Sequence, residues 1–512
     1  MSDKEYVATI KKICSLLQSD PTPEVIQSLR DAFANLSIHL KAGPFLEVFE
    51  TTLSNIPFAA LFSLLAAPDN KLIVAVAEVA GQLLKPVTWA MVHQTFEEYI
   101  IQGLAHPHPV VKCLVLNQFL KCEQKTDPFS AQYSPYIWKC LEGKSDTDAT
   151  KLAKQVLIHL CETGMDMDYL FAESSLDAVR AVLEGDESQR FRVYDVVAVA
   201  VGCSDDVFEL LRQEGIVDTF VKEGDSDDAL AVMNWHELIP AVCTSEAAFS
   251  YLDSVGVFTN ALSQFTADES SLDATHSFTR VSLLKLFSRM VDAQGINPAE
   301  FLVKYDIAPT LGKLISESSS ETDLQSTAIS CLGAIGNNTA ALEHLATEKT
   351  ALTALVEAYN GSISGMRVNC LQTIACIFGH LPEPTKTSSQ TCYELYTQLA
   401  QGKFLVSVTQ EIMKGFEESC VAGFAVIQKM ALHAWGVREI ASYKNVVNFL
   451  LTRDPSKGKT AQQWQFSTIE TIVESREAKD AFDSDAYSRL TKYVKEGPYY
   501  VSTMPQVAIK SS

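Results

Sequence analysis

The sequence predicts an all-α solenoid, a curved array of short helices that repeat along the chain. Apolar residues recur at helical spacing over most of the 512 residues. In residues 25–36, for example, Val25, Leu29, Phe33 and Leu36 fall on one stripe of a helix. Few segments alternate strictly for long enough to predict strands, and similar segments return about every 42 residues, as in helical repeat proteins.

The first repeated feature is a small turn followed by an apolar helix start. It occurs at residues 213–221, 253–262, 304–314 and 347–356, at offsets of about 41, 50 and 43 residues. These offsets are typical of HEAT and armadillo repeats, in which one unit cannot cover its own apolar face and therefore stacks on the next. At about 42 residues per unit, the chain holds about eleven or twelve HEAT/armadillo-like units.

The second repeated feature is a basic residue that enters an apolar helix. It occurs four times, at Lys112, Arg192, Arg280 and Arg367. These positions are about 80, 88 and 87 residues apart, and each interval is close to two repeats. The intervening units carry weaker versions of this helix, with the sequences KLAKQVL, ALAVMNW and LQSTAIS. We favour a structural role, in which each basic residue pairs with an acid of its own or an adjacent unit. Asp195 is the nearest candidate for Arg192. In the alternative, the four residues line an exposed partner-binding surface.

The repeats are expected to form one solenoid over residues 1–496, followed by a tail over residues 497–512. Gly497 and Pro498 end the last helix. A terminal repeat leaves one apolar flank uncovered. We therefore expect the first part of the tail to fold back and cap this flank with Tyr499, Tyr500 and Val501.

Composition limits the partners and the location. The net charge of −22 argues against nucleic acid and favours a partner with a basic face. No apolar run approaches the ~18 residues of a membrane span, and the N-terminus lacks the apolar core of a signal peptide. The twelve cysteines contain no C-x-x-C pair, which indicates reduced core residues of an intracellular protein. We expect a cytoplasmic location, to which the nucleus can be added.

No segment carries a complete catalytic or metal-binding motif. Residues 455–460 end like a phosphate-binding loop, but Arg453 stands where that loop needs glycine. Residues 361–365 have Ile363 at the centre of what would be a nucleophile elbow. His106 and His108 have no third metal ligand nearby in the sequence. We therefore predict a protein that is not an enzyme, without catalytic residues, metal or cofactor.

Three segments, at residues 103–119, 187–197 and 489–501, carry a more specific signal. Together with the repeats, they resemble the family of the 26S proteasome non-ATPase regulatory subunit 5, also called S5b. The most specific of them is Glu-Gly-Pro-Tyr-Tyr-Val near the chain end. The resemblance implies a HEAT/armadillo-like assembly chaperone that holds the C-terminal domain of an AAA+ ATPase subunit of the proteasome base. It also implies that the chaperone is absent from the finished particle.

One alternative is an armadillo-type adaptor that binds a basic linear peptide or another protein. Such adaptors present regularly spaced Trp and Asn on their inner helices. The five tryptophans of this chain follow no repeat spacing and are predicted to be core or cap residues. An enzyme built on a helical array would need a convergent polar cluster, which the sequence does not indicate.

Overall fold

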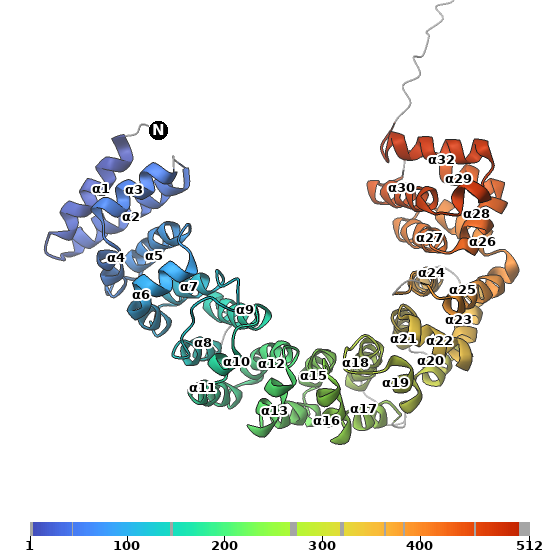
Figure 1. The fold of residues 1–512 in the computed structure, drawn as a ribbon, viewed down its shortest axis with the longest axis horizontal. Coiled ribbons are helices and arrows are strands. Elements are labelled where there is room, and N and C mark those ends of the chain that lie inside the picture. The colour runs from blue at the N-terminus through green and yellow to red at the C-terminus, as the bar shows by residue number, and fades with distance from the viewer. Residues whose placement is uncertain are drawn as a thin grey trace, which may run out of the picture. The chain divides into compact units, whose positions relative to one another are not determined.

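The computed structural model describes residues 4–42, 45–143, 147–266, 274–317, 322–362, 365–381, 384–454 and 457–500. Over these residues the chain is helical, and its only β-type pairing is an isolated bridge between Asn338 and Leu381. The predicted all-α solenoid is therefore confirmed (Figure 1). Contacts within the chain divide it into two compact units, unit 1 at residues 1–225 and unit 2 at residues 226–512. The sequence analysis did not indicate this division.

Unit 1 is built around five helices that pack side by side in chain order, α2, α5, α7, α9 and α12. Its helices are α1 (Lys4–Leu17), α2 (Pro23–Ala42), α3 (Phe45–Asn55), α4 (Phe58–Leu65), α5 (Asn70–Leu84), α6 (Trp89–Leu104), α7 (Pro109–Phe119), α8 (Ser134–Lys139), the 3-10 helix η1 (Cys140–Glu142), α9 (Asp148–Glu162), α10 (Met167–Leu170), α11 (Glu173–Leu183), α12 (Glu187–Val201), α13 (Asp205–Gln213), α14 (Ile216–Lys222) and η2 (Glu223–Asp225).

Unit 2 repeats a three-helix pattern more regularly, and Figure 1 shows the third helices following one another along one side of the unit. The first helices are α16 (Glu246–Ser254), α19 (Pro298–Lys304), α22 (Thr339–Glu348), α25 (Lys386–Gln398), α28 (Ala434–Ser442) and α31 (Ala478–Ala481). The second helices are α17 (Val257–Thr266), α20 (Ile307–Ser316), α23 (Thr350–Gly361), α26 (Phe404–Met413), α29 (Lys444–Leu451) and α32 (Ser484–Glu496). The third helices are α15 (Ala229–Val242), α18 (Ala274–Met290), α21 (Thr322–Gly336), α24 (Gly365–Phe378), α27 (Glu417–Met430) and α30 (Lys459–Glu474), and η4 (Leu399–Gly402) leads into α26.

The basic residues of the second sequence repeat lie on α7, α12, α18 and α24, and the weaker versions of that helix are α9, α15 and α21. In unit 1, α7 packs on α9 and α9 on α12; in unit 2, α15, α18, α21 and α24 pack in succession. Helices with the basic residue and helices with the weaker sequence thus occupy equivalent places in successive repeats, as the sequence predicted.

The first sequence repeat marks the reversal between two helices of a unit. At its four occurrences the chain turns through a residue in the left-handed region, namely Gly215 (φ 74°), Gly256 (φ 85°), Asp306 (φ 51°) and Lys349 (φ 71°). Glycine adopts this conformation without steric cost, whereas a Cβ crowds the following carbonyl. The small turn of the sequence repeat is therefore a backbone requirement, which two positions meet without glycine.

No single helix among the described residues has the length and apolar character of a membrane span. Two pairs of neighbouring helices have this length and apolar character only when they are taken together, and each pair is bent at the break between its helices. The bend is 78° between Leu46–Asn55 and Phe58–Leu65, and 118° between Glu417–Met430 and Ala434–Ser442.

Replacing the turn glycine tests the backbone requirement. Gly215→Ala should lower the free energy of unfolding by about 1 kcal/mol, because alanine is strained at φ 74°. No atom lies within 4 Å of the added Cβ, so the strain is not mixed with a side-chain clash. Gly361→Ala is the matched control, since its Cβ also meets open space and the residue lies in α23. Denaturant unfolding of both variants measures the difference, and equal effects would contradict the requirement.

Candidate partner-binding surface

Arg192 is a buried structural residue. It lies on α12 with 7% of its surface exposed. Its Nη1 donates hydrogen bonds to the carbonyl oxygens of Leu141, at 3.0 Å, and Gly143, at 2.6 Å. Both carbonyls belong to the preceding repeat, at the end of η1, where helix geometry leaves them without backbone donors. Arg192 therefore joins two repeats through main-chain acceptors.

The expected pairing of Arg192 with Asp195 is wrong. The carboxylate of Asp195 instead accepts a hydrogen bond from Nζ of Lys154 on α9, at 2.6 Å. The side chains three positions apart on α12 thus reach the same neighbouring repeat by different routes. Arg192 turns inward to main-chain oxygens, and Asp195 forms a half-exposed ion pair.

The other members of the basic row do not form an exposed stripe. Arg280 on α18 is as buried as Arg192, at 7% exposed. Arg367 on α24 is half-buried, with its guanidinium 5.0 Å from the ring centre of Tyr359 and Nη2 3.4 Å from the carbonyl oxygen of Tyr359. Lys112 on α7 is half-buried. These positions favour the structural role over a partner-binding row.

An ion pair with a buried carboxylate was not found from the sequence. Glu223 in η2 is buried, and Arg190 on α12 binds both of its carboxylate oxygens, at 2.5 and 3.1 Å. The hydroxyl of Tyr194 donates to the same carboxylate at 3.0 Å. Burial, together with the Glu223 carboxylate, raises the pKa of Tyr194, so this hydroxyl stays protonated. The cluster neutralises itself and fastens α12 to η2.

The C-terminal tail contacts its repeat through Arg453. The Nη1 of Arg453 donates to the carbonyl oxygen of Gly497 at 2.8 Å, and Nη2 donates to that of Tyr493 at 3.2 Å. The guanidinium lies 3.7 Å from the ring centre of Tyr493 and 5.5 Å from that of Tyr500. Arg453 is the residue that breaks the phosphate-loop pattern in the sequence, and it serves as a cap for the end of α32.

The expected burial of the tail tyrosines is wrong. Tyr499 remains 53% exposed and Tyr500 44% exposed. The hydroxyl of Tyr499 reaches Oε1 of Gln463 at 3.4 Å, so the ring lies over α30 without being covered. Val501 lies outside the described residues. The guanidinium of Arg453 donates to the carbonyl oxygens at the end of α32, and this needs no buried aromatic ring.

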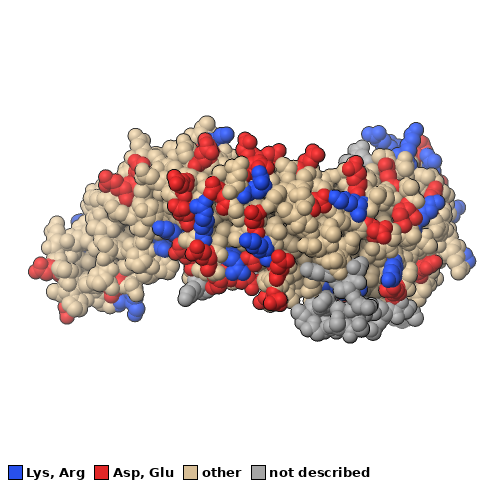
Figure 2. Space-filling model, turned by 90° about the horizontal axis from the view of Figure 1, so that it is seen from below, with Lys and Arg blue, Asp and Glu red and all other residues tan. Residues whose placement is uncertain are grey.

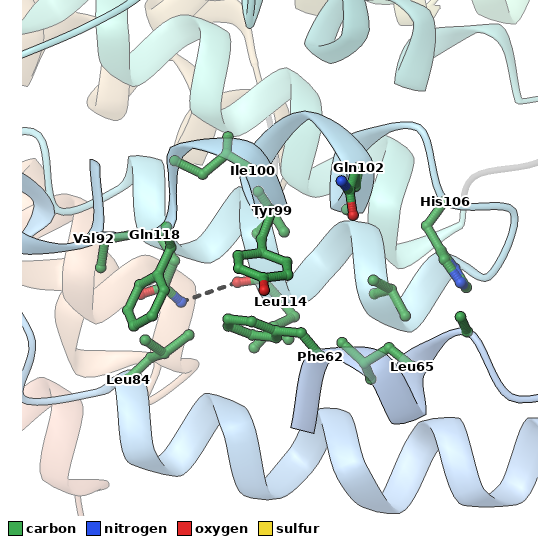
Figure 3. Close-up of a pocket in the computed structure, with 15 residues that line it drawn as sticks. Phe62, Leu65, Leu84, Val92, Tyr99, Ile100, Gln102, His106, Leu114 and Gln118 are labelled. Atoms are coloured by element: carbon green, nitrogen blue, oxygen red, sulfur yellow. Dashed lines mark hydrogen bonds between the residues drawn. The ribbon is translucent and has the colours of Figure 1, made fainter. Parts of the chain in front are cut away.

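Unit 1 holds an apolar cavity of about 110 Å³ between α4, α5, α6 and α7 (Figure 3). Its wall includes the rings of Phe62 and Tyr99, whose centres are 4.7 Å apart. Helix α6 leaves helical geometry at Phe96, with φ −127° and ψ 20°, beside this cavity. The Nε2 of Gln118 is bonded to the carbonyl oxygen of Leu114 at 3.0 Å, as Figure 3 shows. The cavity suits an apolar group and offers no acid–base pair for chemistry.

Two serine–histidine pairs of unit 2 are buried. The Oγ of Ser282 lies 2.9 Å from Nδ1 of His236, and Oγ of Ser388 lies 2.8 Å from Nε2 of His380. All four residues are buried, so no substrate can reach these hydroxyls. Burial lowers the pKa of His236 to about 4, which keeps its imidazole neutral. These pairs connect helices and do not form a catalytic site.

One group of metal-type donors is present among the described residues. His380, Cys392 and His433 are all buried, and one donor atom from each lies within 4.8 Å of the others. No short spacing motif indicates this group in the sequence, because its members are twelve and forty-one positions apart. His106 and His108 are not part of this group.

The tryptophans do not form a peptide-binding row. Trp89, Trp138 and Trp235 are buried, as predicted for core residues. Asn369 on α24 uses its side-chain amide within the solenoid, where Nδ2 donates to the carbonyl oxygen and Oγ of Ser326 at 2.8 and 2.9 Å. The arrangement that would favour an armadillo-type adaptor is therefore not seen at these positions.

The family follows from a match over nearly the whole chain. The model of the family described as proteasome non-ATPase 26S subunit matches residues 11–512. The chain belongs to this family. The resemblance inferred from the three sequence segments is thus confirmed, and the family match also covers the regions between them.

Curated relatives carry the same designation. The 26S proteasome non-ATPase regulatory subunit 5 of Bos taurus is 21% identical over 518 aligned residues, which cover 98% of this chain and 96% of that protein. The Homo sapiens protein of the same name is 21% identical and covers 92% of this chain and 94% of its own length.

Solved structures show the fold alone. Yeast importin-β (Kap95p) matches with a TM-score of 0.56 at 11% identity, over 96% of this chain and 69% of that one. Another importin-β structure matches with a TM-score of 0.53 at 13% identity, over 96% of this chain and 65% of its own. Both agree with a helical solenoid.

The structural role of Arg192 predicts a large loss of stability on truncation. Arg192→Ala should reduce the free energy of unfolding by about 3 kcal/mol, because one buried and one part-buried carbonyl lose their donor. Lys151→Ala on α9 is the control, since it removes an exposed positive charge and should change stability by less than about 0.5 kcal/mol. Thermal and denaturant unfolding decide the matter, and melting of Arg192→Ala that matches the control would favour the exposed-row alternative.

The cap at the chain end predicts that Arg453, and not the tyrosines, stabilises the last repeat. Arg453→Ala should cost about 2 kcal/mol, and Arg453→Lys should restore little, because an ammonium cannot reproduce the planar fork over Tyr493. Tyr499→Ala should cost less than about 0.5 kcal/mol, since the ring is half exposed. The reverse order of the two alanine variants in thermal unfolding would contradict this assignment.

The buried His236 predicts acid sensitivity of unit 2. The unfolded chain protonates this imidazole near its ordinary pKa of 6.5, whereas the folded chain does so only at about 4. The unfolded state therefore binds more protons between these values, and stability falls as the pH is lowered from 6.5 towards 4. One such group contributes at most about 1.4 kcal/mol per pH unit. Urea unfolding at several pH values across this range measures how the free energy of unfolding changes with pH. This pH dependence should be weaker for His236→Gln than for the wild type, and an equal pH dependence would refute the assignment.

Proposed function

We propose that this protein is a non-catalytic assembly chaperone of the base of the 26S proteasome regulatory particle. It binds the C-terminal domain of an AAA+ ATPase subunit, shields that domain until the ATPase ring is assembled, and is absent from the mature particle. The observation that carries the proposal is the family match over residues 11–512. Relatives that align over almost their whole length are named as non-ATPase regulatory subunits.

The burial of polar side chains supports a binding role without catalysis. The Ser282–His236 and Ser388–His380 pairs of unit 2 are buried, and the cavity of unit 1 is apolar. A chaperone of this kind needs a preformed surface and no reacting groups. Helical solenoids supply extended surfaces through their repeats.

Charge supports a basic partner domain. Residues 162–225 contain sixteen Asp and Glu against five Lys and Arg. Figure 2 shows acidic side chains spread over the visible face and interleaved with basic ones, rather than gathered in a single patch. Such a distribution attracts a basic domain at a distance and accelerates its association.

Copurification tests the proposal. Affinity purification of the tagged chain, followed by native separation and mass spectrometry, should recover base ATPase subunits in free or partly assembled form. The complete 26S particle purified through another subunit should be depleted of the chain. Association with the isolated C-terminal domain of the recovered ATPase should weaken with salt, because exposed charges steer it. Stoichiometric recovery of the chain from active complete particles would overturn the proposal.

A further inference from the structure

His380, Cys392 and His433 bring three metal-type donors to one point inside unit 2. His380 follows α24, Cys392 lies on α25, and His433 is the residue before α28. All three are buried, and their donor atoms lie within 4.8 Å of one another. The Sγ of Cys392 is 3.8 Å from Nδ1 of His380. Segments of two successive repeats therefore meet at this cluster.

The spacing is close to that of a tetrahedral zinc site. Bonds of about 2.0 Å to nitrogen and 2.3 Å to sulfur give donor–donor separations of about 3.3 to 3.6 Å around Zn²⁺. The Cys392–His380 pair already lies near that range, and the remaining separations, which are within 4.8 Å, require a closer approach of at most about 1.5 Å. We propose that His380, Cys392 and His433 bind one Zn²⁺ ion through a thiolate and two imidazoles.

The surrounding groups hold each imidazole by its other nitrogen. The Nε2 of His380 lies 2.8 Å from Oγ of Ser388, and Nε2 of His433 lies 2.8 Å from the carbonyl oxygen of Phe378. A carbonyl or hydroxyl behind a ligating histidine fixes the tautomer that leaves the metal-facing nitrogen unprotonated. The Phe378 carbonyl holds the proton of His433 on Nε2 and leaves its Nδ1 for the ion. The Nδ1 of His380 faces the carbonyl oxygen of Ile377 and carries the proton, so this proton moves to Nε2, facing Ser388, when Nδ1 binds the ion. The Oγ of Ser389 lies 3.0 Å from Nδ1 of His433 and has to turn aside for the ion to bind there.

A fourth donor is present at the same point. The carbonyl oxygen of Ile377 lies 2.9 Å from Nδ1 of His380 and 3.7 Å from Sγ of Cys392. Ile377 is in the last turn of α24, where carbonyls have no partner within the helix. Its oxygen completes a four-coordinate shell with one sulfur, two nitrogens and one oxygen.

Charge and protons balance on binding. The Cys392 thiol releases its proton to solvent and coordinates as thiolate, while both imidazoles bind in the neutral form. The Nδ1 proton that His380 shares with Ile377 in the metal-free protein is replaced by the ion, and the ring carries its proton on Nε2, facing Ser388. The ion with one thiolate leaves a single positive charge. The carboxylate of Glu343, which accepts a hydrogen bond from Oγ1 of Thr385, is the nearby negative group.

Metal content of the intact protein tests the site. Because the cluster is buried, the ion enters during folding, so the full chain is expressed with added zinc or refolded with Zn²⁺ or Co²⁺. We expect about one Zn²⁺ per chain and, with Co²⁺, the absorption of a thiolate-bound tetrahedral ion. Cys392→Ser should remove the thiolate band and reduce zinc content several-fold. Cys420→Ser, which alters another buried cysteine away from the group, should change neither.

Two results would overturn the site. One is wild-type protein that folds without zinc and shows no thiolate–Co²⁺ absorption. The other is a Cys392→Ser protein that keeps the metal content of the Cys420→Ser control. If Cys392→Ser does not fold, the wild-type Co²⁺ spectrum still decides. His433→Gln serves as the second variant, since it removes a ligand while keeping a polar side chain next to Phe378.

Discussion

The structure depends on one constraint, that no repeat can cover its own apolar face. Each third helix of unit 2 packs on the third helix of the following repeat, and the stacking leaves main-chain oxygens where helices end or pass closely. Side chains about one repeat away satisfy these oxygens. Oγ1 of Thr373 donates to the carbonyl oxygen of Ile329 at 2.8 Å, and Oγ1 of Thr468 donates to that of Phe424 at 3.1 Å, each across 44 residues. The repeat length thus sets the polar contacts as well as the apolar ones.

The same constraint explains what the sequence could predict. Apolar periodicity and repeat spacing are direct consequences of stacking, so the fold class and the alternation of third helices were predictable. The turn before each second helix was predictable where it contains Gly215 or Gly256. At Asp306 and Lys349 the repeat spacing predicted the turn, but residue identity did not predict its left-handed backbone, because neither residue is glycine.

The contacts of individual polar side chains were less predictable, because many of their partners are main-chain atoms. Every residue has a carbonyl oxygen, so the residue type does not show which carbonyl accepts a hydrogen bond. The carboxylate of Asp195 was therefore a reasonable partner for Arg192, whereas the observed acceptors are the carbonyl oxygens of Leu141 and Gly143. The His380, Cys392 and His433 group was equally hidden. Its members come from different segments of the repeats, and no short spacing motif connects them.

The inward use of arginine also shapes the surface that a partner would meet. In residues 162–225, the side chain of Arg192 binds main-chain oxygens in the interior, and Arg190 neutralises the buried Glu223. Most of the acids in this segment, including Asp177 and Asp205, face solvent. Because cations are committed to holding repeats together while carboxylates remain outside, the surface is more acidic than residue counting suggests. The solenoid therefore presents negative potential over this segment while the same repeats are joined by arginine contacts, and such a surface is complementary to a basic protein domain.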